Sequence, residues 1–253
     1  NHGRAVAYAA SRLGARATVC LSNLVPDVKV RAIEALGADV RRVGRSQDEA
    51  QREAHRLIGE QGFTDIPPFD HPAVIAGQGT ISLELLEDAP DLDVILVPLS
   101  GGGLISGIAL AAKALKPSIR IVGLSMARGA AMHASLMAGK PVEVEELPTL
   151  ADSLGGGIGL GNRWTFDLCR RLVDDVVLLE EEEIYRGMRT LLLEERLVAE
   201  GAAAVGHAAL LAGKVKLSGP AAIVLSGSNA PMEQVLAIGR GEPVTFGGMD
   251  VKG

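Results

Sequence analysis

Short apolar segments alternate with helical patterns along almost the whole chain, and this alternation restricts the fold more than any other feature. The segment DVILVPL (93–99) is a nearly continuous apolar run, typical of a strand buried on both faces of a parallel sheet. Strands separated by helices predict an α/β protein with helices on both faces of its sheet. The expected strands are 17–22, 39–44, 93–99, 119–125, 175–179 and 221–227, and the expected helices are 4–14, 26–37, 47–60, 73–87, 104–116, 129–138, 162–173, 181–196 and 202–213.

Three prolines mark the place where we expect one domain to end. They lie in IPPFDHP (66–72), and proline can continue neither a helix nor a central strand because it lacks a backbone N–H. We therefore predict a smaller α/β domain at 1–68 and a larger, cofactor-binding α/β domain at 69–253.

The composition argues against several classes of protein. The net charge is −6 and the basic residues form no stripe, which disfavours nucleic-acid binding. Cys20 and Cys169 lie far apart inside apolar runs, a pattern that predicts a reduced, cytoplasmic protein without a disulfide framework. No apolar run reaches the roughly 18 residues of a membrane span, so we expect no membrane partner.

The strongest local signal for ligand binding is VPLSGGGLISG (97–107), in which a buried strand runs into three consecutive glycines and then a helix. Glycines let several backbone N–H groups face one point, and the start of a helix adds partial positive charge there. This arrangement predicts a phosphate site at the carboxyl end of the strand. The alternative is a tight turn in which the glycines serve packing alone.

Other motifs narrow the chemistry. Ser106 stands where the dinucleotide pattern needs its third glycine, and no GxxxxGK[ST] motif occurs. The five histidines have no metal-ligand spacing, and GLSMA (123–127) lacks the final glycine of a nucleophile elbow. The glycines of 155–161 fit an ordinary loop, while Ser226 in LSGSN (225–229) could either meet a ligand or cap a turn. We interpret the acidic run at 180–183 as the solvated first turn of a helix.

Several motifs, taken in order, resemble one family. The chain is similar to the fold type II pyridoxal-phosphate (PLP) enzymes of the threonine dehydratase and serine racemase group, related to the tryptophan synthase β subunit. The resemblance covers essentially the whole chain and implies two open, mostly parallel twisted sheets flanked by helices. FDHPAVIAGQGT, SLGGGIG and AEGAAAVG look closest to the dehydratase of hydroxyectoine utilisation. The motifs that carry the family resemblance are Asn1-His2-Gly3, FDHP (69–72), IAGQGT (75–80), SGGGL (100–104), ADSLGGGIG (151–159), VAEGA (198–202) and VLSGSN (224–229).

The resemblance implies a role for each matching residue. Asn1 corresponds to the asparagine that hydrogen-bonds the cofactor's ring hydroxyl, and His2 and Gly3 follow it in the loop that receives the substrate carboxylate. Ser226 corresponds to the hydroxyl that faces the pyridine nitrogen, and Phe69 is expected near the ring. The residues that correspond to the phosphate cradle are Ser100, Gly101, Gly102, Gly103 and Leu104.

The chain departs from the family pattern in three ways. The family's Schiff-base lysine precedes the asparagine motif, so we expect it upstream of Asn1, and we expect the 253 residues to be an inactive fragment with no catalytic residue of their own. Ser125 and Ala131 stand where metal-dependent members place acidic residues, so we predict no metal site. The glutamate that the family follows with proline is here Glu200-Gly201.

The resemblance implies a PLP-dependent lyase that performs β-elimination on a small hydroxy amino acid and acts as a homodimer. It leaves open an amino-acid racemase or a β-replacement enzyme, which would use the same cofactor cradle. If the chain is complete, non-catalytic binding of PLP or another phosphate ligand also stays open.

Overall fold

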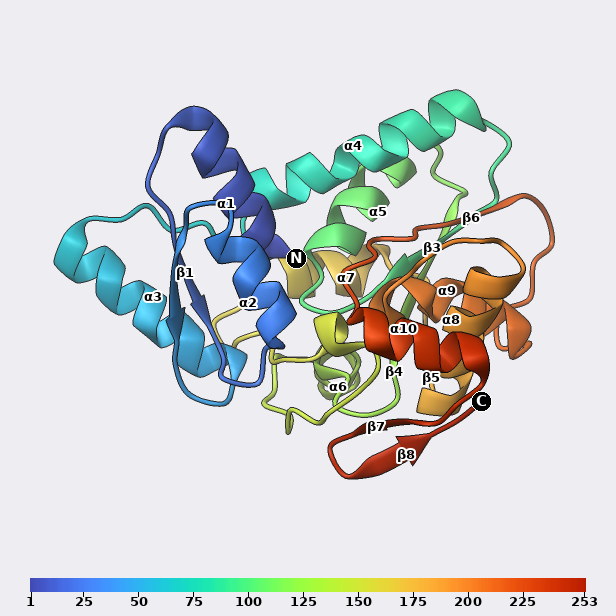
Figure 1. The fold of residues 1–253 in the computed structure, drawn as a ribbon. Helices are drawn as coiled ribbons and strands as arrows, with labels where there is room; N and C mark the ends of the chain where they lie inside the picture. Colours follow the sequence, from blue (N-terminus) through green and yellow to red (C-terminus); the bar gives the residue numbers. More distant parts are fainter. The chain divides into compact units, whose positions relative to one another are not determined.

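The computed structural model describes residues 1–253, and the chain divides into two compact units, Asn1–Pro68 and Phe69–Gly253 (Figure 1). Each unit is an α/β structure with its own parallel sheet. The predicted fold class of parallel sheets flanked by helices is therefore confirmed.

The first unit builds a two-stranded sheet. Strands β1 and β2 pair in parallel from Thr18↔Asp39 to Leu21↔Arg42. Their apolar side chains form a small core with the neighbouring helices, made of Ala7, Val19, Ile33 and Ala38. The elements of this unit are α1 (His2–Leu13), β1 (Thr18–Leu21), α2 (Asp27–Glu34), β2 (Asp39–Arg42) and α3 (Gln47–Gln61).

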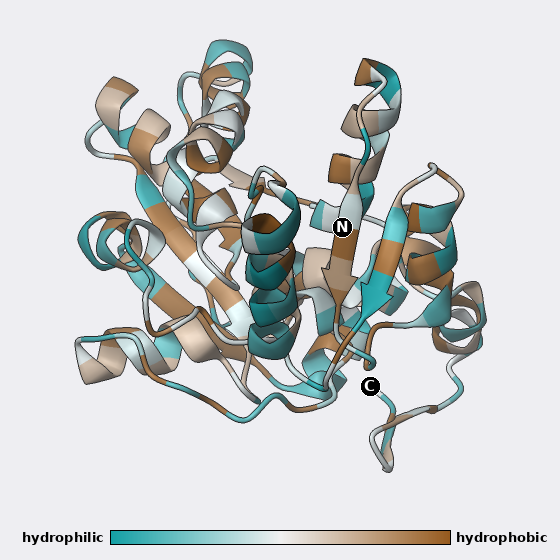
Figure 2. Ribbon diagram, turned by 90° about the vertical axis from the view of Figure 1, so that its left-hand side faces the viewer, coloured by the Kyte–Doolittle hydropathy of each residue, from teal (hydrophilic) through white to brown (hydrophobic).

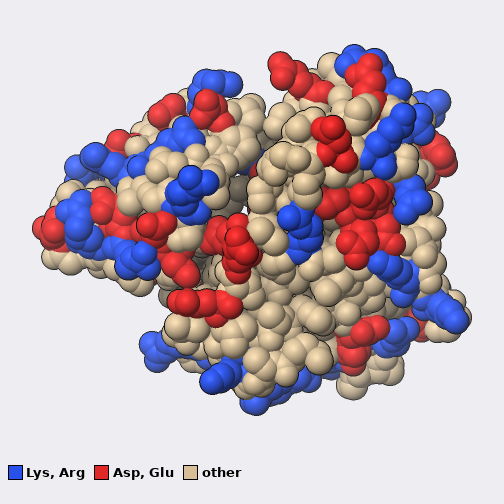
Figure 3. Space-filling model, turned by 90° about the horizontal axis from the view of Figure 1, so that it is seen from below, with Lys and Arg blue, Asp and Glu red and all other residues tan.

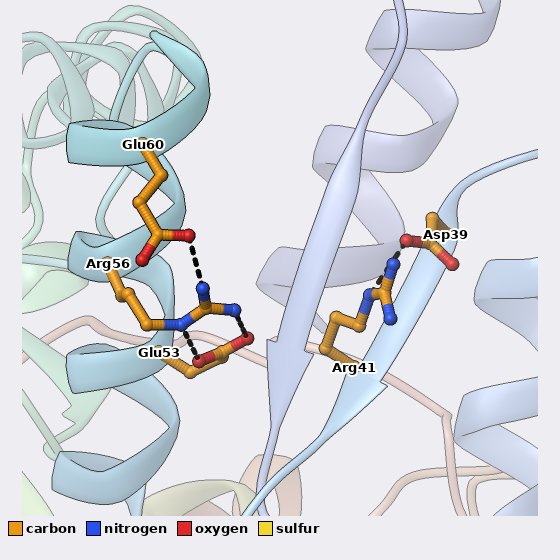
Figure 4. A network of polar contacts seen from close by, with 5 residues as sticks. All are labelled: Asp39, Arg41, Glu53, Arg56 and Glu60. Carbon is orange, nitrogen blue, oxygen red and sulfur yellow. Dashed lines mark hydrogen bonds and ion pairs between the residues drawn. The ribbon is translucent and has the colours of Figure 1, made fainter.

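Helix α3 is polar along most of its length (teal in Figure 2), and charge pairs on its surface suit that composition. Arg56 contacts Glu53 one turn before it, at 2.7 and 2.8 Å, and Glu60 one turn after it (Figure 4). Opposite charges three and four residues apart are neighbours on a helix and stabilise it modestly. At its start, the Ser46 hydroxyl accepts a hydrogen bond from the Glu49 N–H.

The second unit contains a four-stranded, all-parallel sheet with the order β5-β4-β3-β6. Helices cover both of its faces, as a parallel sheet requires (Figure 1). Its elements are α4 (Pro72–Asp88), β3 (Val94–Pro98), α5 (Gly103–Leu115), β4 (Arg120–Met126), α6 (Ala131–Ala138), a 3₁₀ turn at Asp152–Leu154, α7 (Thr165–Leu172), β5 (Asp175–Leu179), α8 (Glu181–Leu193), α9 (Gly201–Leu211), β6 (Ala221–Ile223), α10 (Met232–Arg240), β7 (Val244–Phe246) and β8 (Met249–Val251).

Strand β3 is the centre of the core, because its side chains feed two separate hydrophobic clusters. Val94 and Leu96 belong to the cluster that also holds residues of α8 and α9, and Ile95 and Val97 belong to the cluster of α5 and α7. Successive side chains of a strand point to opposite faces, so a strand covered on both sides must be apolar throughout. This explains the continuous apolar run from which the sequence predicts a buried strand.

Helices α4 and α5 approach each other closely at two glycines. A Cβ atom on Gly107 would lie 2.2 Å from the carbonyl oxygen of Ile75 and 2.7 Å from the amide nitrogen of Gly79. The Ser82 hydroxyl donates to the Ile108 carbonyl at 2.8 Å across the same contact. Because Gly79 and Gly107 have no side chains, α5 can pack this closely against α4.

The end of the chain is where the structure adds most to the expected elements. Strand β6 ends at Ile223, so the predicted strand 221–227 is too long, and its last residues form the loop before α10. Helix α10 and the antiparallel hairpin β7–β8 were not expected. The hairpin strands have three residues each, too few to show a pattern. None of the helices has the length and apolarity that crossing a bilayer requires.

The close contact between α4 and α5 gives a first testable prediction. Gly107→Ala forces a backbone clash with α4, so the free energy of unfolding should fall by about 2 kcal/mol or more, in the range of overpacking. Gly59→Ala is the matched control, because that helical glycine of α3 faces open space and alanine favours helices. Urea unfolding measures both. Equal stability of the two variants would contradict the close packing.

Candidate functional site

The candidate site lies at the carboxyl edge of the four-stranded sheet. Strand β3 ends at Pro98 and leads into Ser100–Leu104, which we name the cradle loop. Strand β6 pairs with β3 in parallel, Leu96 opposite Ile223, and Val224 N–H donates to the Leu96 carbonyl at 3.0 Å. Parallel neighbours end at the same edge of a sheet. The loop after β6, which carries Ser226, therefore leaves the sheet at the same edge as the cradle loop, and Ser226 is exposed there.

The cradle loop presents backbone rather than side chains. Gly102 has a φ of +90°, a conformation that glycine adopts without steric cost, and it is the residue from which α5 begins. The N–H groups of Gly101, Gly102 and Gly103 donate to no acceptor in the chain, and no side chain caps the helix. Free N–H groups at a helix start are the donors that a phosphate needs.

The position of Phe69 explains why two of the three residues must be glycine. A Cβ atom on Gly101 would lie 2.3 Å from Phe69 Cδ1, and one on Gly103 would lie 2.9 Å from Phe69 Cα. The ring and backbone of Phe69 thus occupy the space beside the cradle loop that any larger residue would claim. The structure brings Phe69 and the cradle loop together, as the resemblance implies for residues near one cofactor.

The third glycine is backed by α6 and α7. A Cβ atom on Gly102 would lie 2.9 Å from Met132 Cε, 3.0 Å from Cys169 Sγ and 3.0 Å from Thr165 Cβ. Burial raises the pKa of the Cys169 thiol to about 11, so this sulfur is protonated at neutral pH and has no nucleophilic role. Its function is to fill the space behind Gly102.

The start of α7 is held by a residue far away in sequence. The Asp70 carboxylate accepts hydrogen bonds from the N–H groups of Arg163 at 2.7 Å, Trp164 at 2.8 Å and Thr165 at 2.9 Å. The carboxylate thereby satisfies N–H groups that have no partner within the helix. The sequence gives no hint of this contact, because its partners are more than 90 residues apart.

The second glycine loop, 155–161, is anchored beside the same helix and is more than an ordinary loop. Ile158 is buried in the core cluster of α5 and α7, with 2% of its surface exposed. The Asn162 side chain donates to the Ile158 carbonyl at 3.1 Å and to Thr165 Oγ1 at 2.8 Å, and accepts from Phe166 N–H at 2.9 Å. The loop is thus tied to the start of α7, behind the cradle loop.

The first unit contains the other predicted site residues. Asn1 immediately precedes α1, and His2 and Gly3 lie in its first turn. His2 Nε2 is 2.8 Å from the Ile66 carbonyl oxygen, and a Cβ atom on Gly3 would lie 2.6 Å from Val19 Cγ1. These contacts fix the segment within its own unit, and its cofactor and substrate roles stay predictions.

The acidic run at the start of α8 is only partly the solvated turn that the sequence predicts. Glu180 and Glu183 form a capping box, in which Glu180 N–H donates to Glu183 Oε2 at 2.7 Å. Glu181, however, is only 5% exposed, and its Oε2 accepts from the Leu150 N–H at 2.8 Å while Oε1 has no partner. Burial raises the pKa of this carboxyl. Its hydrogen bond with Leu150 connects α8 to the segment before the second glycine loop.

The buried Glu181 predicts a specific pH dependence. A carboxyl whose pKa is higher in the folded state than in the unfolded state contributes stability at acid pH, and that contribution is lost as the pH rises through the folded pKa. The stability of Glu181→Gln relative to the natural protein should therefore be higher at pH 8 than at pH 4, as measured by urea midpoints. Glu182→Gln removes the same charge from an exposed neighbour and should show a smaller change. A gain for Glu181→Gln that is larger at pH 4 would contradict the assignment.

Comparison with known proteins agrees with this geometry. The family model "Pyridoxal-phosphate dependent enzyme" matches residues 1–227. A Sinorhizobium fredii protein with the provisional name threonine dehydratase is 58% identical over 92% of this chain and 70% of its own length. The L-threonine ammonia-lyase of Geobacter sulfurreducens is 43% identical over 94% of this chain. The structure of maize serine racemase superposes with a TM-score of 0.85 at 34% identity, covering 93% of this chain and 72% of that one.

This chain spans less than two thirds of some of these relatives, for example 59% of the Geobacter enzyme and 58% of the L-threonine ammonia-lyase of Thermotoga maritima. The matches nevertheless cover both units and extend through the cradle loop and the loop of Ser226. The names of these relatives do not mention hydroxyectoine, and the narrower resemblance stays a prediction. The chain belongs to the family of pyridoxal-phosphate dependent enzymes, in the group of the threonine dehydratases and serine racemases.

Proposed function

We propose that the protein is a dehydratase (ammonia-lyase) that eliminates the β-hydroxyl group of a small amino acid such as threonine. The observation that carries the proposal is the cradle loop, where three glycine N–H groups without acceptors meet the uncapped start of α5. Relatives that are 58%, 43% and 41% identical to this chain have dehydratase or ammonia-lyase names, which supports elimination over other reactions on the same cofactor.

The residues present fit pyridoxal phosphate. The N–H groups of the cradle loop would hold its phosphate, and the lack of side chains there leaves the backbone accessible to it. Ser226 would face the pyridine nitrogen, and Phe69 would lie near the ring. Asn1 would bind the ring hydroxyl, and His2 and Gly3 the substrate carboxylate. When bound, the cofactor supplies an electron sink for the α-carbon of the amino acid.

Ser226 bears on which reaction follows. The neutral hydroxyl of Ser226 would not hold the pyridine nitrogen protonated as a carboxylate would. The cofactor would then be a weaker electron sink, which would favour loss of a β-hydroxyl over transamination. The residue therefore supports a lyase, and it disfavours reactions that need a long-lived carbanion.

The substrate, partners and location form a finer part of the proposal. We propose that the substrate is a hydroxy amino acid, and amino acids derived from hydroxyectoine are one candidate. We also propose that the protein acts as a homodimer and is located in the cytoplasm. The basic residues are scattered among acidic ones on the face drawn in Figure 3, without a continuous positive stripe. We propose no nucleic-acid partner, no membrane partner and no metal requirement.

The test of the function is an assay for 2-oxo acid and ammonia. The full natural chain, loaded with pyridoxal phosphate, is incubated with L-threonine, L-serine and hydroxyectoine-derived amino acids. Threonine elimination yields 2-oxobutanoate and ammonia in equal amounts, and we expect this product from at least one of the substrates. A change in chirality without oxo acid would indicate the racemase, and incorporation of an added thiol would indicate β-replacement. Either result without oxo acid would contradict the dehydratase.

Ser226→Asp tests the partner of the pyridine nitrogen. A carboxylate at this position should hold the nitrogen protonated and lower kcat for elimination by tenfold or more, about 1.4 kcal/mol in the barrier. Ser228→Asp is the matched control, since it adds the same charge to an exposed serine of the same loop. Steady-state kinetics measure both variants. Unchanged turnover in Ser226→Asp, or an equal loss in the control, would refute the assigned role.

Gly103→Ala tests the cradle loop itself. The added methyl group would meet the backbone of Phe69 at 2.9 Å, so the loop must shift and its N–H groups must change direction. The dissociation constant for pyridoxal phosphate should rise at least tenfold in an absorbance titration, about 1.4 kcal/mol. Gly59→Ala, which faces open space in α3, should bind the cofactor like the natural protein. An unchanged affinity of Gly103→Ala for pyridoxal phosphate would contradict the assignment of the cradle loop to the phosphate.

A further inference from the structure

Asp70 occupies a position that joins the two sides of the cradle loop. It directly follows Phe69, whose ring and backbone lie against Gly101 and Gly103. Its carboxylate accepts three backbone hydrogen bonds at 2.7–2.9 Å from residues 163–165, where α7 begins. One side chain therefore links the segment in front of two cradle glycines with the helix behind the third.

The two ends of this link are themselves firmly held. His71 caps α4 from the position before Pro72, with its Nδ1 accepting from Ala73 N–H at 3.2 Å. The His71 N–H donates to the Phe69 carbonyl at 2.9 Å. At the other end, Thr165 is fully buried, and its carbonyl lies 3.5 Å from the Ser106 hydroxyl in the first turns of α5. A movement of Asp70 would therefore be passed to the loop on both sides.

The charge of Asp70 also removes a competing anion site. The start of α7 has three N–H groups directed at one point, which is the arrangement that binds anions at helix N-termini. The Asp70 carboxylate takes all three. The start of α5 contacts the start of α7 through Ser106 and Thr165, and it has no such cap. It therefore stays available to a ligand phosphate.

We propose that Asp70 is a positioning residue for the cofactor phosphate. It holds Phe69 and the start of α7 at the distance that keeps the N–H groups of Gly101, Gly102 and Gly103 directed at one point. It touches neither cofactor nor substrate in this role. The inference rests on the assignment of the cradle loop to the phosphate under the proposed function.

The prediction concerns affinity for the phosphate group rather than activity. In the full natural chain, Asp70→Ala should raise the dissociation constant for pyridoxal phosphate at least tenfold, as measured by equilibrium dialysis. The dissociation constant for pyridoxal, which lacks the phosphate, should change less than twofold. Asp70→Asn keeps an acceptor oxygen for Trp164 and Thr165 but loses the acceptor for Arg163. Its dissociation constant for pyridoxal phosphate should therefore lie between those of the natural protein and Asp70→Ala. If Asp70→Ala does not fold, Asp70→Asn alone carries the test.

Ser46→Ala is the matched control for a general loss of helix capping. Ser46 caps α3 through the Glu49 N–H, so its removal destabilises a helix of the first unit, whereas the cradle loop belongs to the second. This variant should leave the dissociation constants of both ligands unchanged. A merely structural Asp70 would instead lower the unfolding midpoint and leave both dissociation constants unchanged in the folded protein.

The outcomes separate this inference from the proposed function. If the natural protein does not prefer pyridoxal phosphate to pyridoxal, the assignment of the cradle loop itself is wrong. If it does, but the Asp70 variants weaken both ligands equally or neither, the cradle assignment stands and the positioning role of Asp70 is overturned. A selective loss for the phosphate-bearing ligand, graded from Asn to Ala, is the result that the geometry predicts.

Discussion

The pairing of β3 with parallel neighbours on both sides is the constraint on which the rest of the second unit depends. Because β3 is buried on both faces, every one of its residues must be apolar, and polar chemistry can begin only where the strand ends. That end is the cradle loop. The same pairing brings the end of β6 and its Ser226 loop to this edge, so the ligand chemistry follows from the sheet register.

The cradle loop depends on the absence of side chains at its three glycines. Three glycines allow Phe69, α6 and α7 to approach within distances that a methyl group would violate. The free N–H groups are then held in place by packing and by the Asp70 carboxylate. A phosphate site of this kind is made of backbone, so its precision depends on neighbours that contact no ligand.

The local elements could be read from the sequence, because each depends on neighbouring residues. The buried strand, the glycines and the following helix are contiguous, and their pattern predicts the turn from strand to helix that the structure shows. The anion site at this turn stays a prediction. The contacts between distant segments could not be predicted. Asp70 contacts the start of α7, which is more than 90 residues away in the sequence. Glu181 cannot be distinguished from its exposed neighbours in the sequence, because its burial depends on the distant segment of Leu150. The short hairpin β7–β8 has too few residues for a periodic signal.

The central claim is that the backbone of the cradle loop binds the phosphate of pyridoxal phosphate. Amide hydrogen exchange of the full natural chain, with and without the cofactor, tests it most directly, since the N–H groups of Gly101, Gly102 and Gly103 have no acceptor in the chain. The account predicts that exchange in a peptide spanning 100–106 slows at least tenfold when the cofactor binds. Tight binding of the cofactor with unchanged exchange in that peptide would contradict the account.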